Sequence, residues 1–357
     1  MVEVIRGALK DYAWGVPDGL VAWSGERTGA PQAELWFGSH PGAPSPLVGQ
    51  PVTLDAVLSP NEVPLLTKLL AAAQPLSIQV HPDAQLAKVS FERQAQPGSD
   101  QVYSDANEKT ELLVAIEEFE VFAGWRDREQ ALAILAQIDG TELARPILET
   151  DGPIAAIPAL RAIDHEGRGE QLVSALRALG MNSSEVDAYG TVAQLYRSDP
   201  GLLVTVLLQY RALAPGNAIF VPAGVPHSYI RGLGLEVMTS SDNVVRLGLT
   251  PKPVFVEAAL AALTNSPDEV IFTSEFGERI SPAGAPFAAT ITSNETQLES
   301  GAFRLVLALE SEASVRAHGG GATISLQQGE AAVLSAEEPA VLVSTAGVVA
   351  VVEHLPR

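Results

Sequence analysis

The segment LAPGNAIFVPAG, residues 213–224, carries the pattern on which the fold prediction rests. It has the form of a strand end, a glycine turn, a small residue and a second strand over residues 218–221. A second copy of this unit is LQQGEAAVLSAE, residues 326–337. His227 closely follows the first copy, and the second copy lacks such a histidine. The repeat predicts two related β units, of which only the first would hold a metal.

This strand–turn–strand unit is common in cupin-type β-barrels. Any antiparallel β protein can produce similar matches, so two barrels remain one of two interpretations. Residues 1–125 support a β fold because they form short segments that Pro and Gly bound closely. The expected strands are 33–37, 75–80, 111–116 and 120–124, and the run 63–73 is helix-like.

The pattern changes between residues 127 and 197. Apolar residues recur at helical spacing and Gly or Pro separates the runs, which predicts a helical insertion of roughly seventy residues. Strands are expected again at 202–209, 218–221 and 235–238, followed by a helix at 253–263 and a strand-rich region from about 270. The fold class is therefore mainly β with an α-helical insertion, as two cupin-like, jelly-roll-type barrels plus a helical domain.

Composition narrows the class of protein. The 357 residues include no cysteine, which excludes disulfides and thiolate metal sites. The net charge of −21 repels nucleic acid and anionic membranes. No stretch approaches the ~18 consecutive apolar residues of a membrane helix, and the first residues lack a signal-peptide pattern. We expect a cytoplasmic protein with neither nucleic acid nor membrane as a partner.

Three segments offer metal ligands. In QPLSIQVHPD, residues 74–83, Gln79 and His81 lie two apart in an expected strand and so point to the same face. Glu111 opens an apolar strand, and His227 follows a Pro-rich turn. Imidazole and carboxylate groups are standard zinc ligands, and this set would leave a coordination position open. Taken singly, a histidine beside proline is more often a surface residue, and Glu111 alone would be a solvated carboxylate.

Basic residues form a second grouping. Arg246 and Lys252 lie close together in SSDNVVRLGLTPK, residues 240–252, and Lys109 lies two residues before Glu111. Arginine holds phosphate through two parallel hydrogen bonds, and lysine acts as a point charge. With only 22 Lys and Arg in the chain, this grouping indicates an anion site. The alternative is that these cations pair with nearby acids such as Asp242.

Together these segments resemble the type I mannose-6-phosphate isomerase (phosphomannose isomerase) family. The resemblance covers residues 12 to 252 and is most specific in QPLSIQVHP and SDNVVRLGLTPK. Its segments are YAWG (12–15), AELWFGSHP (33–41), KLLAAAQPLSIQVHPD (68–83), NEKTE (107–111), PAGVPHSYIRG (222–232) and LEVMTSSDNVVRLGLTPK (235–252).

The resemblance implies an enzyme with one zinc ion per chain that interconverts mannose 6-phosphate and fructose 6-phosphate through an enediol. The implied zinc ligands are Gln79, His81, Glu111 and His227. Arg246 would line the active site and Lys252 would help to hold the phosphate, with Trp14 and Ser77 lining the pocket. The base is open among Lys109, Glu236 and Tyr229, each of which lies near a ligand in sequence.

One departure from the family pattern concerns proton transfer. The family often has a histidine in HKPE where this chain has Glu108, so any role of that histidine is altered or lost here. The remaining histidines His165, His318 and His354 have no polar neighbours in sequence and are interpreted as structural or exposed.

Two other functions are alternatives to the isomerase. One is a non-catalytic sugar-phosphate-binding cupin, against which the retained ligands and Arg246 argue. The other is a different metal-dependent cupin enzyme such as an iron oxygenase, a class that favours two histidines and one carboxylate without a Gln ligand. The expected protein is a monomer. Its expected domains are residues 1–126 (the N-terminal part of the catalytic cupin-like domain), 127–200 (the helical insertion), 201–266 (the remainder of the catalytic domain) and 267–357 (a C-terminal cupin-like β domain).

Overall fold

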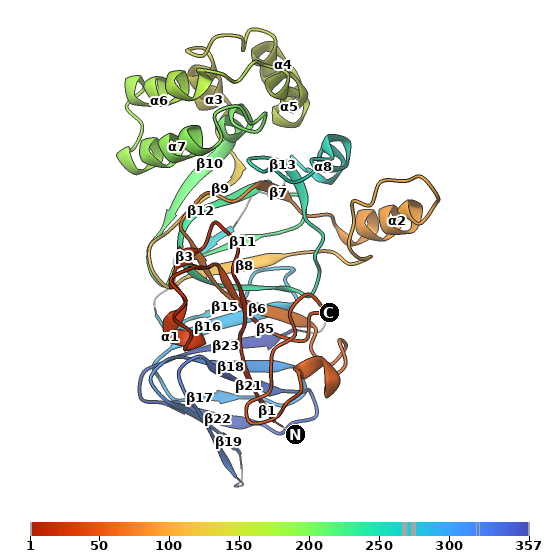
Figure 1. The fold of residues 1–357 in the computed structure, drawn as a ribbon, viewed down its shortest axis with the longest axis vertical. Helices are drawn as coiled ribbons and strands as arrows, with labels where there is room; N and C mark the ends of the chain where they lie inside the picture. Colours follow the sequence, from red (N-terminus) through yellow and green to blue (C-terminus); the bar gives the residue numbers. More distant parts are fainter. Residues whose placement is uncertain (1, 266–269, 273–275, 319, 321, 356–357) are drawn as a thin grey trace.

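The computed structural model describes residues 2–265, 270–272, 276–318, 320 and 322–355. The chain is mainly β, and helices α3 to α7 gather at one end of an elongated molecule (Figure 1). The largest sheet lies in the middle, and the sheets of the C-terminal residues lie at the other end. The predicted mainly β fold with a helical insertion is confirmed.

The middle sheet, called here the site sheet, contains every strand that bears on the candidate site. Its main path in hydrogen-bonding order is β14 (Val270–Phe272), β11 (Ala218–Val221), β8 (Glu111–Ala115), β12 (His227–Thr239), β6 (Leu65–Ala72), β5 (Glu34–Phe37) and β2 (Ala8–Lys10). The strands off this path are β7 (Ile78–Val80), β9 (Phe119–Trp125), β10 (Leu208–Leu213) and β13 (Val245–Gly248). Over the described residues both ends of the path are open, so the hydrogen bonds do not close a barrel.

The long strand β12 joins the two parts of the site sheet. Its first residues pair with β7 and β9, whereas Gly232 to Thr239 pair with β6. The change falls at Gly232, where φ is 137° and a Cβ would lie 2.6 Å from the Glu118 carbonyl oxygen. Only glycine fits this conformation and this close approach. Strand β12 can therefore pair with both parts of the site sheet. Its residues on both sides of Gly232 line one cavity, which is described below.

The C-terminal residues form two further sheets. One has the order β1 (Glu3–Arg6), β21 (Glu330–Leu334), β18 (Arg304–Glu310), β23 (Val348–His354), β16 (Phe287–Thr292) and β15 (Arg279–Ile280). The other has the order β17 (Thr296–Leu298), β22 (Val341–Thr345), β19 (Ala313–Ala317) and β20 (Thr323–Leu326). The N-terminal strand β1 therefore pairs with the C-terminal part of the chain. A small separate pair is β3 (Val16–Pro17) with β4 (Pro31–Gln32).

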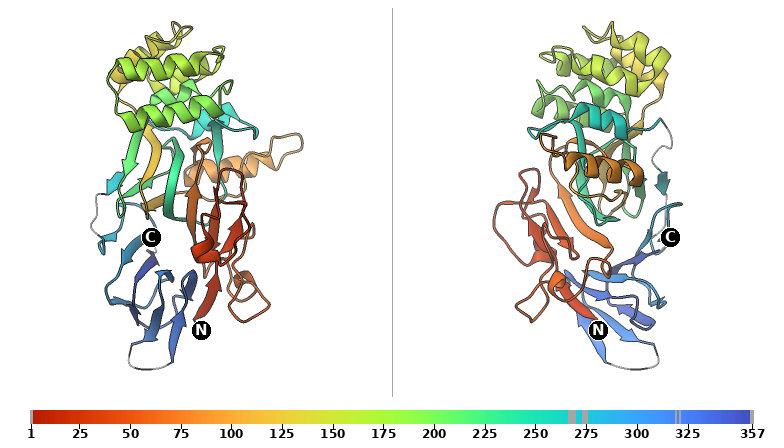
Figure 2. Two further views of the ribbon diagram at one scale, coloured as in Figure 1. Left: turned by 60° about the vertical axis from the view of Figure 1, so that its left-hand side comes forward. Right: turned by 90° about the vertical axis from the view of Figure 1, so that its right-hand side faces the viewer.

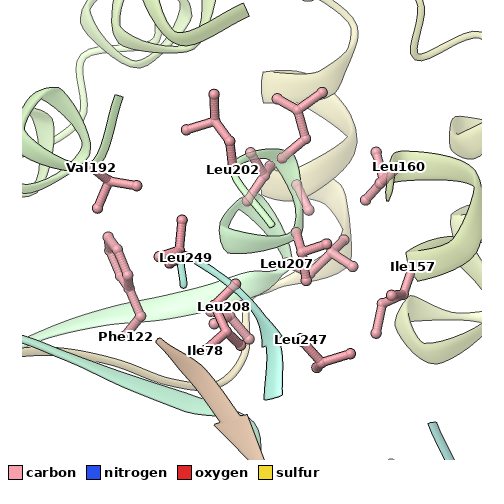
Figure 3. Packing of buried hydrophobic residues seen from close by; sticks show 14 of the residues in the cluster. Ile78, Phe122, Ile157, Leu160, Val192, Leu202, Leu207, Leu208, Leu247 and Leu249 are labelled. Carbon is pink, nitrogen blue, oxygen red and sulfur yellow. The ribbon is translucent and has the colours of Figure 1, made fainter. Parts of the chain in front are cut away.

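The helical insertion covers the end of the site sheet that carries β9, β10 and β13 (Figure 2). Apolar side chains from both layers form one core, which includes Leu160 and Leu202 on the helical side and Ile78, Phe122 and Leu249 on the sheet side (Figure 3). The insertion comprises α3 (Arg128–Leu135), α4 (Ala144–Asp151), α5 (Pro153–Arg161), α6 (Arg168–Ala178), α7 (Ser183–Leu195) and the 3-10 turn Leu203–Leu207. The remaining helices are α1 (Val21–Ser24), the 3-10 turn Leu54–Ala56, α2 (Ala84–Gln94) and α8 (Val256–Ala262).

Two sequence predictions need correction. The helix-like run 63–73 is the strand β6, which lies between β5 and β12 and is buried on both faces. A strand covered on both faces has a continuous apolar run rather than alternation, which single-sequence periodicity cannot distinguish from a buried helix. Helix α2 was missed, although Asp83 caps it by accepting a hydrogen bond from the Leu86 N–H at 2.7 Å.

Smaller differences lie at element ends. The expected strand 202–209 is the 3-10 turn Leu203–Leu207 followed by β10, and the expected strand 75–80 shortens to β7. Both copies of the repeat do form strand–turn–strand units, as β10–β11 and β20–β21. Among the described residues, no helix has the length and apolar character needed to cross a membrane.

Candidate metal centre

Three buried side chains converge where β7, β8 and β12 begin or end. His81 follows β7, Glu111 is the first residue of β8 and His227 is the first residue of β12. Glu111 Oε2 lies 3.2 Å from His81 Nε2 and 3.3 Å from His227 Nε2. All three residues are at most 3% exposed. Two imidazoles and one carboxylate at such distances can hold one metal ion.

The backbone sets the orientation of both imidazole rings. His81 Nδ1 lies 2.8 Å from the Asn243 carbonyl oxygen, and His227 Nδ1 lies 3.1 Å from the Val225 carbonyl oxygen. A carbonyl oxygen only accepts, so Nδ1 carries the proton in each ring. The other nitrogen of each ring, Nε2, is the one that lies toward Glu111. Metal-binding histidines in proteins are commonly oriented by such a bond from Nδ1 to a carbonyl oxygen.

The charges at the cluster fit a bound cation. Burial lowers the pKa of His81 to about 4, so this ring is neutral near pH 7. Burial alone would raise the pKa of Glu111, but the adjacent Lys109 and His81 offset this and hold the pKa well below its usual value. Lys109 donates to Glu111, and its Nζ lies 3.4 Å from His81 Nε2. A carboxylate and two ring lone pairs thus share one buried position, an arrangement that positive charge stabilises.

Gln79 lies on the same face as His227 because the two residues are direct partners across β7 and β12. On the other side of β7, Gln79 is the direct partner of Arg246 in β13. These three residues therefore form one row across the sheet, and all three line the same cavity. The register therefore places Gln79 next to His227 in the wall of the cavity.

The cluster lies at a cavity of about 620 Å³. Its lining includes most of the residues predicted to form the site, which come from the site sheet and from the loops at its end. They are Trp14, Ser77, Gln79, Lys109, Glu111, His227, Tyr229, Glu236, Arg246 and Lys252. Tyr196, just after α7, also lines the cavity, and its hydroxyl donates to the Pro75 carbonyl oxygen at 2.9 Å. The helical insertion thus contributes directly to the cavity.

Arg246 and Lys252 have no carboxylate within ion-pair distance in the part of the chain that the structure describes. The Arg246 guanidinium makes only a long contact, 3.4 Å, with the Val244 carbonyl oxygen. The ammonium group of Lys252 lies 5.9 Å from the centre of the Tyr12 ring. The nearby Asp242 pairs instead with His40 at 3.5 Å. The alternative of pairing with Asp242 is therefore not what the structure shows, and both cations are available to an anion in the cavity.

A buried network of charged residues lines the same cavity, and of its members only Glu236 was predicted from sequence. Lys68 Nζ donates to Glu236 Oε2 at 2.9 Å and lies 3.8 Å from Glu34 Oε1. The Trp36 indole N–H donates to Glu34 Oε2 at 2.8 Å. The single lysine inside the apolar run 65–72 was the available signal, but the helical interpretation of that run concealed its orientation.

Two residues are candidates to carry a proton. Glu236 belongs to this network, and Tyr229 lies next to it. Burial raises the pKa of Glu236, against the opposing charge of Lys68. Burial and the neighbouring Glu236 carboxylate raise the pKa of Tyr229 well above its usual value. Near neutral pH Tyr229 is therefore a hydrogen-bond donor, whereas Glu236 can accept a proton.

Asn243 was also missed from sequence, and its side chain stabilises the loop next to His81. Its side-chain amide donates to the Asp105 and Asn107 carbonyl oxygens at 2.9 and 2.8 Å, and its Oδ1 accepts from the Ser104 N–H at 2.8 Å. These bonds fix the loop whose carbonyl oxygen orients His81.

Other residues noted from sequence lie outside the cluster. Glu108 is half-buried and is not among the described residues that line the cavity. His165 is buried in the helical insertion, and His354 ends β23. His318 follows β19, so none of these three histidines joins the cluster.

Comparison with known proteins identifies relatives over most of the chain. Residues 4–128 match the family described as phosphomannose isomerase type I, catalytic domain. Mannose-6-phosphate isomerase of Salmonella typhimurium is 31% identical over 295 residues, which cover 74% of this chain and 75% of that protein.

Solved structures agree with the sequence comparison. A crystal structure of a point mutant of the Salmonella typhimurium phosphomannose isomerase superposes with a TM-score of 0.84 at 27% identity, covering 100% of both chains. A crystal structure of zinc-bound mannose 6-phosphate isomerase superposes with a TM-score of 0.82 at 26% identity, covering 99% of this chain and 100% of that chain.

Fold and site together define a mainly β protein that can hold one metal ion beside a cation-lined cavity. Within that class, the chain belongs to the type I phosphomannose isomerase family. The family resemblance inferred from sequence is confirmed.

Proposed function

We propose that the chain is a zinc-dependent aldose–ketose isomerase that interconverts mannose 6-phosphate and fructose 6-phosphate. The observation that carries this proposal is the juxtaposition, in a member of this family, of the His81–Glu111–His227 cluster with Arg246 and Lys252. Neither cation has a carboxylate partner among the described residues. This reaction needs a metal ion near the reacting oxygens of the sugar. It also needs a separate cationic site that binds the phosphate group.

The residues present fit a zinc ion. Gln79, His81, Glu111 and His227 would hold it, and three of these ligands are neutral while one is anionic. The ion would then keep a net charge of about +1, since only one carboxylate opposes its charge of about +2. When bound, zinc supplies Lewis-acid stabilisation of negative charge on the substrate oxygens.

Arg246 and Lys252 would bind the phosphate at the other end of the cavity. The guanidinium group offers two parallel N–H donors to phosphate oxygens, and the ammonium group adds a second positive charge. Anchoring the remote phosphate orients the reacting carbons and supplies binding energy for the chemical step. Trp14 and Ser77 line the same cavity and would contact the sugar.

The reaction moves the proton on C2 to C1 and the proton on the C2 oxygen to the C1 oxygen. We assign the carbon-bound proton to Glu236, because its raised pKa makes a carboxylate a stronger base. Tyr229 stays protonated and would donate to a substrate oxygen. Lys109 would donate to the oxygen that develops negative charge, since its ammonium group lies beside Glu111 at the cluster.

The test is an assay of purified protein with mannose 6-phosphate, in which formation of fructose 6-phosphate is measured. Glu236→Gln should reduce turnover strongly while substrate affinity and zinc content stay near wild type. Tyr229→Phe should have a smaller effect. If Glu236→Gln turns over at the wild-type rate, the base lies elsewhere, and no product from the wild-type protein would refute the isomerase assignment.

We further propose that the chain forms two jelly-roll-type cupin domains and a helical insertion. Residues 1–126 and 201–266 would form the catalytic domain, residues 127–200 the insertion and residues 267–357 the C-terminal domain. The two strand–turn–strand units, β10–β11 and β20–β21, support this division. Strand β1 is an exception, because it pairs with β21 and belongs with the C-terminal domain. The boundary at 266–267 lies outside the described residues.

The proposed enzyme works as a cytoplasmic monomer on a small-molecule substrate, without nucleic acid or membrane as a partner. The net charge of −21 supports the last point. Light scattering of the purified protein tests the oligomeric state, with a mass near 37.5 kDa expected for a monomer.

A further inference from the structure

The Asp199 carboxylate binds three backbone N–H groups from two segments of the chain. Asp199 follows the last helix of the insertion. Its Oδ1 accepts from Gly201 N–H at 2.6 Å and from Leu249 N–H at 2.8 Å, and its Oδ2 accepts from Thr250 N–H at 3.1 Å. Leu249 and Thr250 directly follow β13, the strand of Arg246. One carboxylate therefore joins the helical insertion to the segment between the two phosphate-binding cations.

The backbone at this junction is strained and closely packed. Leu249 has a φ of 55°, which is uncommon for a residue other than glycine. Gly248 has a φ of 151°, and a Cβ there would lie 2.4 Å from the Gly201 Cα. Such conformations cost free energy and persist only where neighbouring contacts enforce them. The three bonds to Asp199 are charge-assisted, which makes them stronger than bonds between neutral groups.

Apolar packing supports the same segment from the side of the insertion. Leu247 and Leu249 belong to the core that also contains Ile157, Leu160 and Leu202 (Figure 3). Arg161 at the end of α5 donates to the Leu247 carbonyl oxygen. Packing fixes the side chains of this segment, and Asp199 fixes the backbone of the turn after Gly248.

The turn after Gly248 sets the relative position of the two side chains proposed to bind phosphate. Arg246 lies before it and Lys252 after it, and both side chains line the cavity together with Leu249 and Thr250. Asp199 itself is not among the described residues that line the cavity. Any effect of Asp199 on the substrate is therefore indirect, and its side-chain bonds to Leu249 and Thr250 act through the turn.

We propose that Asp199 is a positioning residue, through which the helical insertion fixes Arg246 and Lys252 at the spacing that phosphate binding requires. This inference rests on the proposed function for the identity of the anion. It assigns the helical insertion a part in substrate affinity in addition to covering the sheet.

The experiment compares Asp199→Ala with a matched control, Asp18→Ala. Asp18 also accepts two backbone N–H bonds in a turn, from Thr28 and Gly29 at 2.9 Å each, but it does not line the cavity. The measurements are kcat and KM for mannose 6-phosphate, zinc content, and the affinity for inorganic phosphate by titration calorimetry.

Loss of the three bonds should raise KM and the phosphate Kd of Asp199→Ala about tenfold, while kcat stays within about twofold. Zinc content should be unchanged, and Asp18→Ala should match the wild type in KM and phosphate affinity. Unchanged KM and phosphate affinity in Asp199→Ala would overturn the proposal. A loss confined to kcat or to zinc would overturn it as well.

Asp199→Asn provides the second variant if Asp199→Ala does not fold. The amide oxygen can keep the bonds from Gly201 and Leu249, while the NH2 group faces the Thr250 N–H. KM and phosphate Kd should then rise about threefold, an intermediate effect for one lost bond, and wild-type values would refute the inference. A wild-type protein that binds phosphate but makes no fructose 6-phosphate would end the proposed reaction, while the phosphate titrations would still decide the role of Asp199.

Discussion

The two strand–turn–strand units of this chain have similar backbones and different surroundings. In the first, β10 and β11 lead to His227, which joins buried polar residues at the ends of β7 and β8. In the second, β20 and β21 pack into an apolar core, and none of the described residues there joins a metal-binding cluster. Glu111 opens β8 and Glu330 opens β21, but Glu330 pairs with the exposed Arg6 at 3.0 Å instead of with histidines. The difference teaches that a few side chains at strand ends, rather than the backbone unit, make a site.

Arg304, the first residue of β18 next to β21, is a large buried charged residue whose contacts are structural. Arg304 is 1% exposed and donates to several backbone carbonyl oxygens. Its acceptors are the carbonyl oxygens of Glu299, Ala302, Ser335, Glu338 and Pro339, at 2.7 to 3.1 Å. The same property, a buried charge at strand ends, therefore serves chemistry in one region and loop anchoring in the other.

Replacing the glutamate that begins β8, or the one that begins β21, should give the largest difference in zinc content and turnover between the two regions. Glu111→Ala removes the only carboxylate of the cluster, so zinc should be lost and turnover should fall about a thousandfold or more. Glu330→Ala should keep zinc and turnover at wild-type levels. Metal analysis and kinetics on both variants check this, and a Glu111→Ala protein with full zinc occupancy would contradict the ligand assignment.

Arg304→Ala should show the structural role of the second region. Several buried carbonyl oxygens would lose their donor, so the free energy of unfolding should fall by about 3–4 kcal/mol. The variant should keep its zinc and its turnover at temperatures where it remains folded. Urea denaturation measures the change, and a loss below about 1 kcal/mol would contradict this role.

Arg246→Ala should separate substrate binding from metal binding inside the first region. Zinc should stay, and kcat/KM should fall about a hundredfold because a bidentate phosphate contact is lost. Arg279, which pairs with Glu353 in the C-terminal sheet, offers a control, and Arg279→Ala should leave kinetics unchanged. Full activity of Arg246→Ala would remove its assigned role.

Lys252→Ala should have the smallest effect in this series. Its ammonium group is exposed, so the solvent screens its charge. KM should rise about threefold to fivefold at low salt, with kcat unchanged, and the difference should shrink at high salt. A salt-independent loss of kcat would indicate a different role.

The sequence predicted the parts of the site that lie in short segments. Gln79 and His81 were predicted from the alternation of side chains along a strand. The other candidate residues were predicted from motifs of a few residues. Lys68 was missed because a strand buried on both faces has the same apolar pattern as a buried helix. Asp199 and Asn243 were missed because their partners lie far away in the chain or in irregular loops, where no periodicity applies.

Turn residues and hydrophobic periodicity predicted the mainly β class and the helical insertion, but not how these parts pack against each other. Strand β1 pairs with β21 across more than 300 residues, a contact that no local pattern encodes. The contact of the insertion with the segment after β13 is likewise a tertiary property, made by Asp199 and by the core in Figure 3.

The central claim is tested most directly by measuring zinc content together with turnover of mannose 6-phosphate, on protein purified without added metal. We predict about one zinc per chain, and formation of fructose 6-phosphate that a chelator abolishes and zinc restores. Bound iron with oxygen consumption, or a zinc-loaded protein that makes no fructose 6-phosphate, would contradict the account.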